Sequence, residues 1–465
     1  MSSQSNFLPL RLPLPPPVPR LDAPDVDAMV ARAALAQREF ESWNETRVDA
    51  LLREVADTID AHAEQLALAA VEETGLGNAP DKTIKNRLAS SGVYAAMAGR
   101  PGVGHLRTTE AGVTEIASPM GVIFGLVPQT HPVATFVFKV LIALKARNAL
   151  ILSCHRGAQQ VTNQTGDLIL EVLERHAAPP YLLQWVRQRA DRESTLAFMH
   201  HPGVALVLAT GGAGMVRAAY SSGTPAIGVG PGNTPTWVRP DADPAEVADA
   251  ILLSKTFDNG VACSSEHNLV VDIGIVQDLV AALTQRGATL VRPDEIPSVL
   301  DRVFDLETGH VRRELMGRPA DDLLEAAGLR RVDAARLLVV PARDDDVAGP
   351  LGHEKLAPIV SLFTVSGDDD AIALCKRLLV EDGSGHTAIV HTRDRAAIER
   401  FVQEMRVSRV LVNAPGLHGS IGLGTGLDRS MTLGTGTFGG TSTTDNVTFR
   451  HLSNIKRVAY PEVAA

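Results

Sequence analysis

The chain has 465 residues, which is too long for one compact core and indicates two or three domains. Hydrophobic residues make up 45% and charged residues 21% of the chain, as in ordinary globular proteins, and the formal net charge is −10. That charge argues against nucleic acid or an anionic membrane as the main partner. Only three cysteines occur, Cys154, Cys263 and Cys375, and their wide spacing excludes a disulfide framework and a CxxC zinc site.

Residues 1–24 form a proline-rich N-terminal arm that includes the stretch "FLPLRLPLPPPVPRL". We expect it to be an extended polyproline segment that lies on the surface or on a neighbouring subunit, with a targeting tail as the alternative. It lacks the basic start, continuous apolar stretch and cleavage site of a signal peptide. No uninterrupted apolar run is long enough to span a membrane, so a cytoplasmic location without a membrane partner is expected.

The following elements alternate between helix and strand. Apolar residues recur at helical spacing from Asp25 to about Ala70, and a glycine-rich break precedes another helix in "EETGLGNAPDKTIKNRLASS". Strand-like "GVTEIASPMGVIFGLVPQTHP", helical "VATFVFKVLIALKARN", strand-like "ALILS", helical "GDLILEVLERHA" and strand-like "VALVLAT" then follow in order. Such alternation predicts an α/β fold with a parallel sheet and right-handed crossovers. A second α/β series runs from about Thr236 to Arg429, and the glycine- and threonine-rich stretch 432–446 is expected to be loop.

The stretch "VALVLATGGAGMVRAAYSSG" reads as strand, glycine turn and helix. Gly211, Gly212 and Gly214 would let a ligand approach the backbone, and the helix N-terminus that follows attracts an anion such as a pyrophosphate. The pattern is not the full GxGxxG fingerprint, so a plain turn remains an alternative at this point. The run "GVGPGNTP" has a similar ambiguity between tight turns and backbone that lines a site.

Cys263 lies in the polar, glycine-containing stretch "KTFDNGVACSSEH", which is typical of a loop that presents a side chain. A thiolate attacks an aldehyde carbonyl to form a thiohemiacetal, and loss of hydride to a nicotinamide leaves a thioester. Local backbone dipoles would lower the pKa of the thiol. A buried structural cysteine is the alternative reading of the residue alone.

Neither a metal site nor a nucleic-acid surface is expected. The 14 histidines are scattered, and the adjacent pair His200 and His201 would not point at one ion from a helix or a strand. Aromatic residues make up only 4% of the chain, which disfavours base stacking.

The segment "SKTFDNGVACSSEHNLVV" resembles the nucleophile segment of CoA-acylating aldehyde dehydrogenases. The likeness extends, in the family's order, over about residues 70–446. It is carried by "AVEETGLGNAPDKTIKN", "SPMGVIFGLVPQTHP", "LIALKARNALILS", "LATGGAGMVRAAYSSGTPAIGVGPGNTP", "GHEKLAPIV", "GSGHTAIVHT" and "TLGTGTFGG". The resemblance implies an aldehyde dehydrogenase-like fold and the acylation of coenzyme A by an aldehyde, with NAD as cofactor.

The resemblance also implies roles for single residues. Cys263 matches the nucleophile, and Gly211, Gly212 and Gly214 match the turn at the cofactor phosphates. Ser153 matches a position at the adenosine, and Glu354 matches the carboxylate that accepts from the nicotinamide ribose hydroxyls. Without the resemblance, Glu354 would be read as an exposed charge.

Acylation is favoured over hydrolysis because hydrolytic relatives carry a glutamate that activates water in an "ELGGK" segment. Here the corresponding stretch is "IGVGPGN", and Gly228 stands near the place of that glutamate. His386 in "GSGHT" matches a histidine that handles the thiol proton or contacts CoA, with a structural histidine as the alternative.

One position departs from the family. The family's "PxTNP" asparagine, which helps to hold the oxyanion together with the amide of the nucleophile, is replaced by His131 in "PQTHP". Loss of one oxyanion donor typically costs about 10²–10³ in rate. His131 therefore either keeps the donor role, retunes it for an anionic or unusual aldehyde, or marks a weakened enzyme.

The expected organisation is an N-terminal arm at 1–24, an NAD-binding Rossmann-like domain at 25–235, a catalytic domain at 236–429, and a C-terminal return at 430–465. The resemblance implies that this return pairs with 107–118 in a homodimer or homotetramer, in the cytoplasm or in a bacterial microcompartment. Arg156 would contact a 2′-phosphate if NADP were the cofactor. Four arginines are candidates for binding an anionic substrate: Arg217, Arg239, Arg409 and Arg429.

Three alternatives remain open on the sequence: a hydrolytic aldehyde dehydrogenase, a catalytically silent scaffold or compartment cargo, and a reductive enzyme of the γ-glutamyl phosphate type. The "FDNGxxCxSE" wording argues against the last of these.

Overall fold

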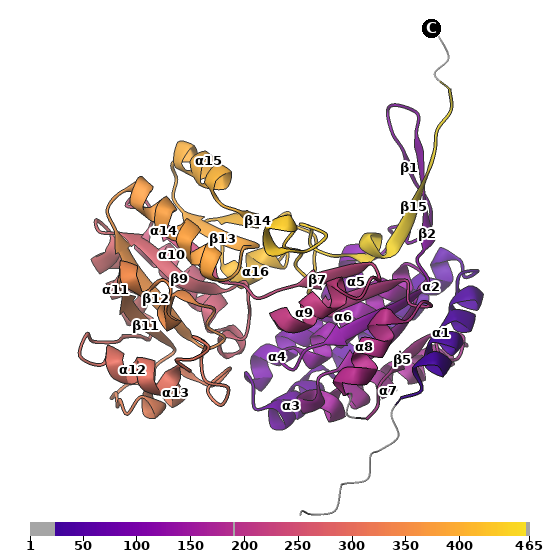
Figure 1. Cartoon of the computed structure of the whole chain (residues 1–465), viewed down its shortest axis with the longest axis horizontal. Coiled ribbons are helices and arrows are strands. Elements are labelled where there is room, and N and C mark those ends of the chain that lie inside the picture. Colours follow the sequence, from indigo (N-terminus) through magenta and orange to yellow (C-terminus); the bar gives the residue numbers. More distant parts are fainter. Residues whose placement is uncertain (1–23, 189–190, 462–465) are drawn as a thin grey trace, which may run out of the picture.

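The computed structural model describes residues 24–188 and 191–461. Nearly all of the expected proline-rich arm lies outside the described residues. Figure 1 shows two α/β domains side by side, with a narrow β-sheet that projects from the N-terminal domain. The expected α/β class is therefore confirmed, and the described residues include no helix that combines the length and apolarity needed to cross a bilayer.

The N-terminal domain is built around a parallel five-stranded sheet in the order β5-β4-β3-β6-β7. Every residue of β3 and β4 is buried, as expected for a parallel sheet covered on both faces. The strands are β3 (Val122–Val127), β4 (Ala149–Cys154), β5 (Leu183–Trp185), β6 (Leu206–Thr210) and β7 (Ala226–Val229). From β3 the chain builds β4 and β5 on one side, and β6 and β7 on the other. A topological switch point therefore lies between β3 and β6, where ligands of open α/β sheets bind.

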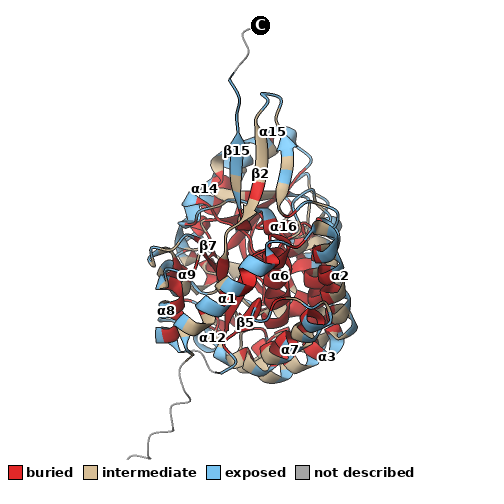
Figure 2. Ribbon diagram, turned by 90° about the vertical axis from the view of Figure 1, so that its right-hand side faces the viewer, coloured by how far each residue is buried: buried red, intermediate tan, exposed pale blue. Residues whose placement is uncertain are grey.

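Helices cover both faces of this sheet. All 14 residues of α6 are buried, which fits its apolar composition on every side. The other helices of the domain each have exposed as well as buried residues. The helices are α1 (Val26–Phe40), α2 (Glu45–Ala61), α3 (Ala63–Thr74), α4 (Ala79–Arg87), α5 (Val93–Met97), α6 (Pro132–Lys145), α7 (Gln159–Arg175), α8 (Arg192–His200) and α9 (Ala213–Tyr220). Figure 2 shows the buried residues gathered along the inner faces of these helices.

The second domain contains a parallel seven-stranded sheet in the order β10-β11-β12-β9-β8-β13-β14. Its strands are β8 (Thr234–Val238), β9 (Glu266–Asp272), β10 (Ala288–Leu290), β11 (Leu337–Ala342), β12 (Ile359–Val365), β13 (Gly385–His391) and β14 (Val407–Val412). Its helices are α10 (Pro244–Lys255), α11 (Val276–Gln285), α12 (Ile296–Val303), α13 (Ala320–Ala326), α14 (Asp368–Glu381), α15 (Arg395–Glu404) and α16 (Gly416–Ser420). The domain boundary expected after residue 235 falls inside β8, so the second sheet begins two residues earlier.

The projecting sheet is antiparallel and contains β1 (Gly104–Thr108), β2 (Thr114–Pro119) and β15 (Ser453–Val458) in the order β1-β2-β15. In its register Ser453 lies opposite Pro119 and Val458 lies opposite Thr114. The C-terminal segment thus returns to the N-terminal domain and pairs with part of the 107–118 segment. The role of this sheet in assembly stays a prediction.

A small apolar cluster lies apart from the large domain cores. It comprises Phe257, Ala262, Leu417, Ile421 and Leu433, with Leu88 and Leu423 packed against it. Its members come from α16, the segment before β9 and the C-terminal loop. This cluster surrounds the candidate nucleophile.

Candidate active site

Cys263 follows a strained turn between α10 and β9. The short 3-10 helix Phe257–Gly260 contains Asp258 and Asn259 at φ 51° and 54°, in the left-handed region that asparagine and aspartate tolerate better than most residues. Cys263 is partly exposed, whereas Cys154 and Cys375 are buried. The interpretation of Cys263 as a presented side chain therefore agrees with its position.

The turn is held in place by α4. The buried carboxylate of Asp258 accepts hydrogen bonds from Lys82 Nζ at 2.9 Å, from Lys85 Nζ at 2.5 Å and from the Asn78 amide at 3.0 Å. In return, the backbone amide of Asp258 donates to Asp81 Oδ2 at 2.7 Å. Burial lowers the pKa of Lys82 to about 8, although Asp258 opposes the shift. The lysines of α4 in the N-terminal domain thus fix, through Asp258, the loop of the second domain that carries Cys263.

His131 lies at the carboxyl end of β3, immediately before α6. Its Nδ1 is 3.1 Å from Lys85 Nζ, and its ring lines the same cavity as Cys263. Burial, followed by the nearby Lys85 and Lys82 charges, holds the pKa of His131 well below its usual value. The ring is therefore neutral at physiological pH.

The cavity at Cys263 has a volume of about 90 Å³ and is bounded by both domains. Most of its wall is apolar, from Leu88, Ala134, Val229, Phe257, Ala262, Leu417, Ile421, Met431 and Leu433. The polar lining residues are Lys85, His131, Thr135, Thr210, Ser264 and His418. The His418 ring packs edge-on against Phe257, with 5.3 Å between ring centroids. The cavity can hold a short apolar molecule against the thiol.

The thiol of Cys263 is a weak acid in this setting. Burial raises its pKa to about 12, and the Glu354 charge adds to the increase, while Arg409 and Lys85 oppose it. A backbone hydrogen bond lowers the pKa of the thiol, as expected from the sequence, but desolvation of the thiolate is the larger effect and the net shift is upward.

A second, larger cleft of about 520 Å³ lies between the two domains. Gly212, Ala213 and Pro231 line one side, and Glu354 and Asp382 belong to the other. Gly212 is the N-cap residue of α9, and no atom lies within 4 Å of where a Cβ would stand at Gly212 or Gly214. No neighbouring protein atom would clash with a side chain at these two positions. The open space therefore fits a ligand that contacts the backbone there. Of the three glycines in this turn, Gly212 lines the cleft together with Glu354, and the binding of a dinucleotide there stays a prediction.

Glu354 connects this cleft to the backbone next to Cys263. Its Oε1 accepts from the Gly232 amide at 3.0 Å. Burial, followed by repulsion from Asp382, raises the pKa of Glu354 to about 8. At neutral pH the carboxyl group therefore carries a proton much of the time.

Three sequence-predicted site residues, Gly228, Ser153 and His386, line neither of these two cavities, and the role of Ser153 at the adenosine stays a prediction. Gly228 does not face Cys263: a Cβ there would meet Val216 at 2.8 Å and Tyr220 at 3.0 Å. Successive residues of a strand point to opposite faces, so the next residue of β7, Val229, lines the cavity instead. Ser153 is the last residue but one of β4 and is buried, with its Oγ 3.3 Å from Thr195 Oγ1.

His386 is the third of these residues. It is fully buried at the start of β13, with Nδ1 3.0 Å from Thr387 Oγ1, and it does not line either cavity described above. Burial and the nearby Arg409 lower the pKa of His386 to about 3, so its ring is neutral. The structure offers no support for His386 as a base next to Cys263.

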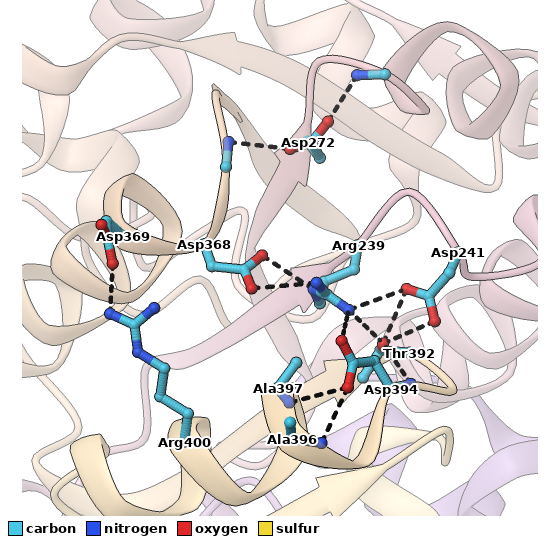
Figure 3. Close-up of polar contacts among 12 residues, drawn as sticks. Arg239, Asp241, Asp272, Asp368, Asp369, Thr392, Asp394, Ala396, Ala397 and Arg400 are labelled. Atoms are coloured by element: carbon cyan, nitrogen blue, oxygen red, sulfur yellow. Dashed lines mark hydrogen bonds and ion pairs between the residues drawn. The ribbon is translucent and has the colours of Figure 1, made fainter.

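Two of the candidate arginines are already engaged within the protein. Figure 3 shows Arg239 between Asp368, Asp241 and Asp394, with a bidentate pair to Asp368 at 3.0 and 3.1 Å. Arg409 is buried, and its guanidinium donates to backbone carbonyls of His386, Gly434 and Thr444 and to Asn446 Oδ1. Neither is free to bind a substrate, and neither lines the cavity at Cys263.

Sequence reasoning missed the Asp258 cluster, Val229 and the buried charge of Arg409. Asp258 and both lysines stand in segments that carry the family resemblance, "FDNG" and "DKTIKN", yet nothing in either segment shows that they meet. The sequence around Arg409 does not indicate that its side chain is buried, because its hydrogen-bond partners Gly434 and Asn446 come from a loop more than 20 residues away.

Comparison with known proteins places these features in a family context. Residues 17–298 match the model of the "Aldehyde dehydrogenase family". The bifunctional aldehyde-alcohol dehydrogenase AdhE of Escherichia coli K12 is 38% identical over 441 residues, which cover 94% of this chain and 49% of that protein. The chain thus spans about half the length of this relative.

Solved structures extend the likeness to the whole fold. An acetylating aldehyde dehydrogenase from Geobacillus thermoglucosidasius is 37% identical with a TM-score of 0.91, covering 95% of this chain and 97% of that one. Rhodopseudomonas palustris propionaldehyde dehydrogenase, solved with bound CoA and an acylated cysteine, is 28% identical with a TM-score of 0.85. That comparison covers 93% of this chain and 96% of the other.

Proposed function

Because this chain belongs to the aldehyde dehydrogenase family, we propose that it oxidises a small aldehyde and transfers the acyl group to coenzyme A. One observation carries the choice of acylation over hydrolysis. Among the described residues, none of those that line the cavity at Cys263 bears a carboxylate, and the position that faces the thiol from β7 is Val229. A thioester on Cys263 would therefore meet no carboxylate able to activate water, and we propose that it persists until a thiol reacts with it.

The residues of the cavity support the first step. The Cys263 thiol gives its proton to water, and the thiolate sulfur then attacks the aldehyde carbon. A carbon–sulfur bond forms, the carbon–oxygen π bond breaks, and its electron pair moves to the carbonyl oxygen, which gains negative charge. His131 and the backbone amide of Cys263 are proposed to donate hydrogen bonds to that oxygen. The neutral His131 ring suits this role. It carries one N–H group that can donate, and it has no positive charge that would hold the Cys263 thiolate in an ion pair.

The cleft between the domains fits a nicotinamide dinucleotide. Gly211, Gly212 and Gly214 would lie at its phosphates, and Glu354 would bind ribose hydroxyls. When bound, the cofactor supplies a hydride acceptor for the thiohemiacetal carbon. The hydrogen bond from the Gly232 amide to Glu354 keeps this carboxyl group at a fixed distance from the Cys263 backbone.

Transfer to coenzyme A completes the cycle. The CoA thiolate attacks the thioester carbon, a new carbon–sulfur bond forms, and Cys263 leaves as the thiolate. The apolar wall around Cys263 slows competing hydrolysis because it excludes water.

The substrate is proposed to be a short, uncharged aldehyde. The cavity is small and mainly apolar, and its lysine, Lys85, is already engaged by Asp258 and His131. An anionic aldehyde would lose hydration without gaining a free cation. A panel of neutral, hydroxylated, carboxylated and sulfonated aldehydes tests this, with NADH formation recorded at equal concentrations. A preference for a charged aldehyde would contradict it.

NAD is proposed as the cofactor, with NADP as the alternative. Arg156 is exposed directly after β4, where it is available to a 2′-phosphate. A comparison of kcat/KM for NAD and NADP, in the wild type and in Arg156→Ala, decides between them. Loss of NADP activity alone in the variant would assign Arg156 to the 2′-phosphate.

The β1-β2-β15 sheet is proposed to join copies of this chain. Strands β1 and β15 are both edges of that sheet, and unpaired strand edges readily pair with another chain. Light scattering of the wild type and of a variant with Ile455→Pro, in the middle of β15, tests the assembly. We expect the variant to form smaller species.

A further inference from the structure

We propose that Lys85 is a positioning residue that fixes the tautomer of His131, so that its Nε2 carries the hydrogen available to the substrate oxygen. This inference rests on the proposed function, because it deepens the role given there to His131. The observation is a contact between a lysine of α4 and the histidine that replaces the family's asparagine.

The direction of the hydrogen bond follows from the chemistry of the two groups. Lys85 Nζ lies 3.1 Å from His131 Nδ1, and an ammonium group has hydrogens to donate but no lone pair to accept with. Nδ1 must therefore be the acceptor. A neutral imidazole carries one ring hydrogen, which then resides on Nε2.

Lys85 is itself held firmly. Its Nζ donates to Asp258 Oδ2 at 2.5 Å, and the same oxygen accepts from Lys82 Nζ at 2.9 Å. Both Lys85 and His131 line the cavity at Cys263. The Asp258 carboxylate thus anchors the charge behind His131 as well as the turn that precedes the nucleophile.

This arrangement solves a problem that a histidine creates and an asparagine does not. A side-chain amide always presents N–H hydrogens, whereas a neutral histidine in the wrong tautomer presents a lone pair to the developing oxyanion. The Lys85 charge beside Nδ1 also strengthens donation from Nε2 as negative charge grows on the substrate oxygen. A lysine in this place therefore lets histidine take over the asparagine's role.

The test compares Lys85→Met in two backgrounds, the wild type and His131→Asn. Lys82→Met is the matched control, because Lys82 contacts the same Asp258 oxygen but its other contact is the Thr130 carbonyl, not the His131 ring. We expect Lys85→Met to lower kcat/KM about 10²-fold in the wild type, the usual effect of one oxyanion donor, and less than about threefold in the His131→Asn background. Lys82→Met should have the same effect in both backgrounds.

An equal loss from Lys85→Met in both backgrounds would overturn the inference, since Lys85 would then act only through Asp258. A second readout does not depend on turnover. Nitrogen-15 NMR of histidine-labelled protein, with His131 assigned by its loss in His131→Asn, should show the Nε2–H tautomer in the wild type and not in Lys85→Met. An Nδ1–H tautomer in the wild type would refute the proposal even if the enzyme acylates CoA. The expected tautomer in a protein without aldehyde activity would instead count against the proposed function alone.

Discussion

Gly232 lies against the backbone of Cys263 so closely that a Cβ at residue 232 would stand 2.0 Å from the Cys263 carbonyl oxygen. The amide of the same glycine donates to Glu354 Oε1 at 3.0 Å. One residue therefore joins the nucleophile of the proposed reaction to the carboxyl group in the cofactor cleft. This contact explains why the run "GVGPGNTP" needs a glycine there.

Gly232→Ala should lower both stability and activity. The added carbon meets backbone atoms that cannot rotate away, and overpacking of this kind typically costs about 1–3 kcal/mol of unfolding free energy. We expect kcat to fall more than cofactor affinity, because the displaced group is the nucleophile. Chemical denaturation and steady-state kinetics measure the two effects. Gly230→Ala, in the same run but with open space around the added carbon, is the control for stability and should leave the midpoint unchanged.

Val229→Glu should create aldehyde hydrolysis. Val229 lines the cavity at Cys263, so a glutamate there would stand beside the thioester as a general base for water. General bases contribute about 10²–10⁴ in rate, and we expect acid formation without CoA to rise at least about tenfold over the wild type. The assay is acid release per NADH formed in the absence of CoA.

Gly228→Glu is the matched control for that experiment. Its side chain would run into Val216 and Tyr220, so it should destabilise the protein without producing acid. Acid production by Gly228→Glu, and none by Val229→Glu, would reinstate Gly228 as the position facing the thiol.

Asp258→Asn should destabilise the protein strongly. The substitution removes the charge that Lys82 and Lys85 share in a buried site, and breaking a buried pair costs about 3–5 kcal/mol. The exposed pair between Arg395 and Glu399 provides the comparison, since Glu399→Gln should cost no more than about 0.5 kcal/mol. Urea unfolding measures the loss of unfolding free energy in each variant. Similar losses in Asp258→Asn and Glu399→Gln would mean that the Asp258 cluster contributes little to stability.

The reactivity of Cys263 should increase with pH over a wide range. With its pKa raised to about 12 by burial, the thiolate fraction grows about tenfold per pH unit between pH 7 and pH 10. We expect the rate of alkylation by iodoacetamide to follow this slope, and to increase when NAD⁺ is added because a cationic ring favours the thiolate. Cys263→Ser reports the background from the buried Cys154 and Cys375. A rate that levels off below pH 8 would show a thiol of low pKa.

The sequence predicted the fold class and the elements around the site because these depend on local periodicity and on an ordered series of motifs. It also predicted that the glycine turn and Glu354 belong together, which the 520 Å³ cleft supports. It placed Gly228 near the position of the hydrolytic glutamate but did not show that the neighbouring Val229 lines the cavity, since in a strand one residue reverses the face to which a side chain points. It identified the backbone effect that lowers the pKa of the Cys263 thiol but not the larger desolvation that raises it, because desolvation depends on atoms brought in from both domains.

His386 and Arg409 show a second limit of sequence reasoning. His386 follows a glycine turn in an otherwise ordinary strand, and nothing in that pattern reveals that the ring is enclosed. The terminal nitrogens of the Arg409 guanidinium donate to the carbonyls of residues 386, 434 and 444. Residues 434 and 444 become its neighbours only after the C-terminal loop folds back onto β14. Such contacts belong to the tertiary structure.

The most direct test of the proposed function is the dependence of NADH formation on coenzyme A, measured with propionaldehyde for the wild type and for Cys263→Ala. We predict that the wild type produces one acyl-CoA per NADH, that activity collapses without CoA, and that Cys263→Ala is inactive under both conditions while it still binds NAD. Acid released at a comparable rate without CoA would contradict acylation. Turnover that survives in Cys263→Ala would contradict the assignment of the nucleophile.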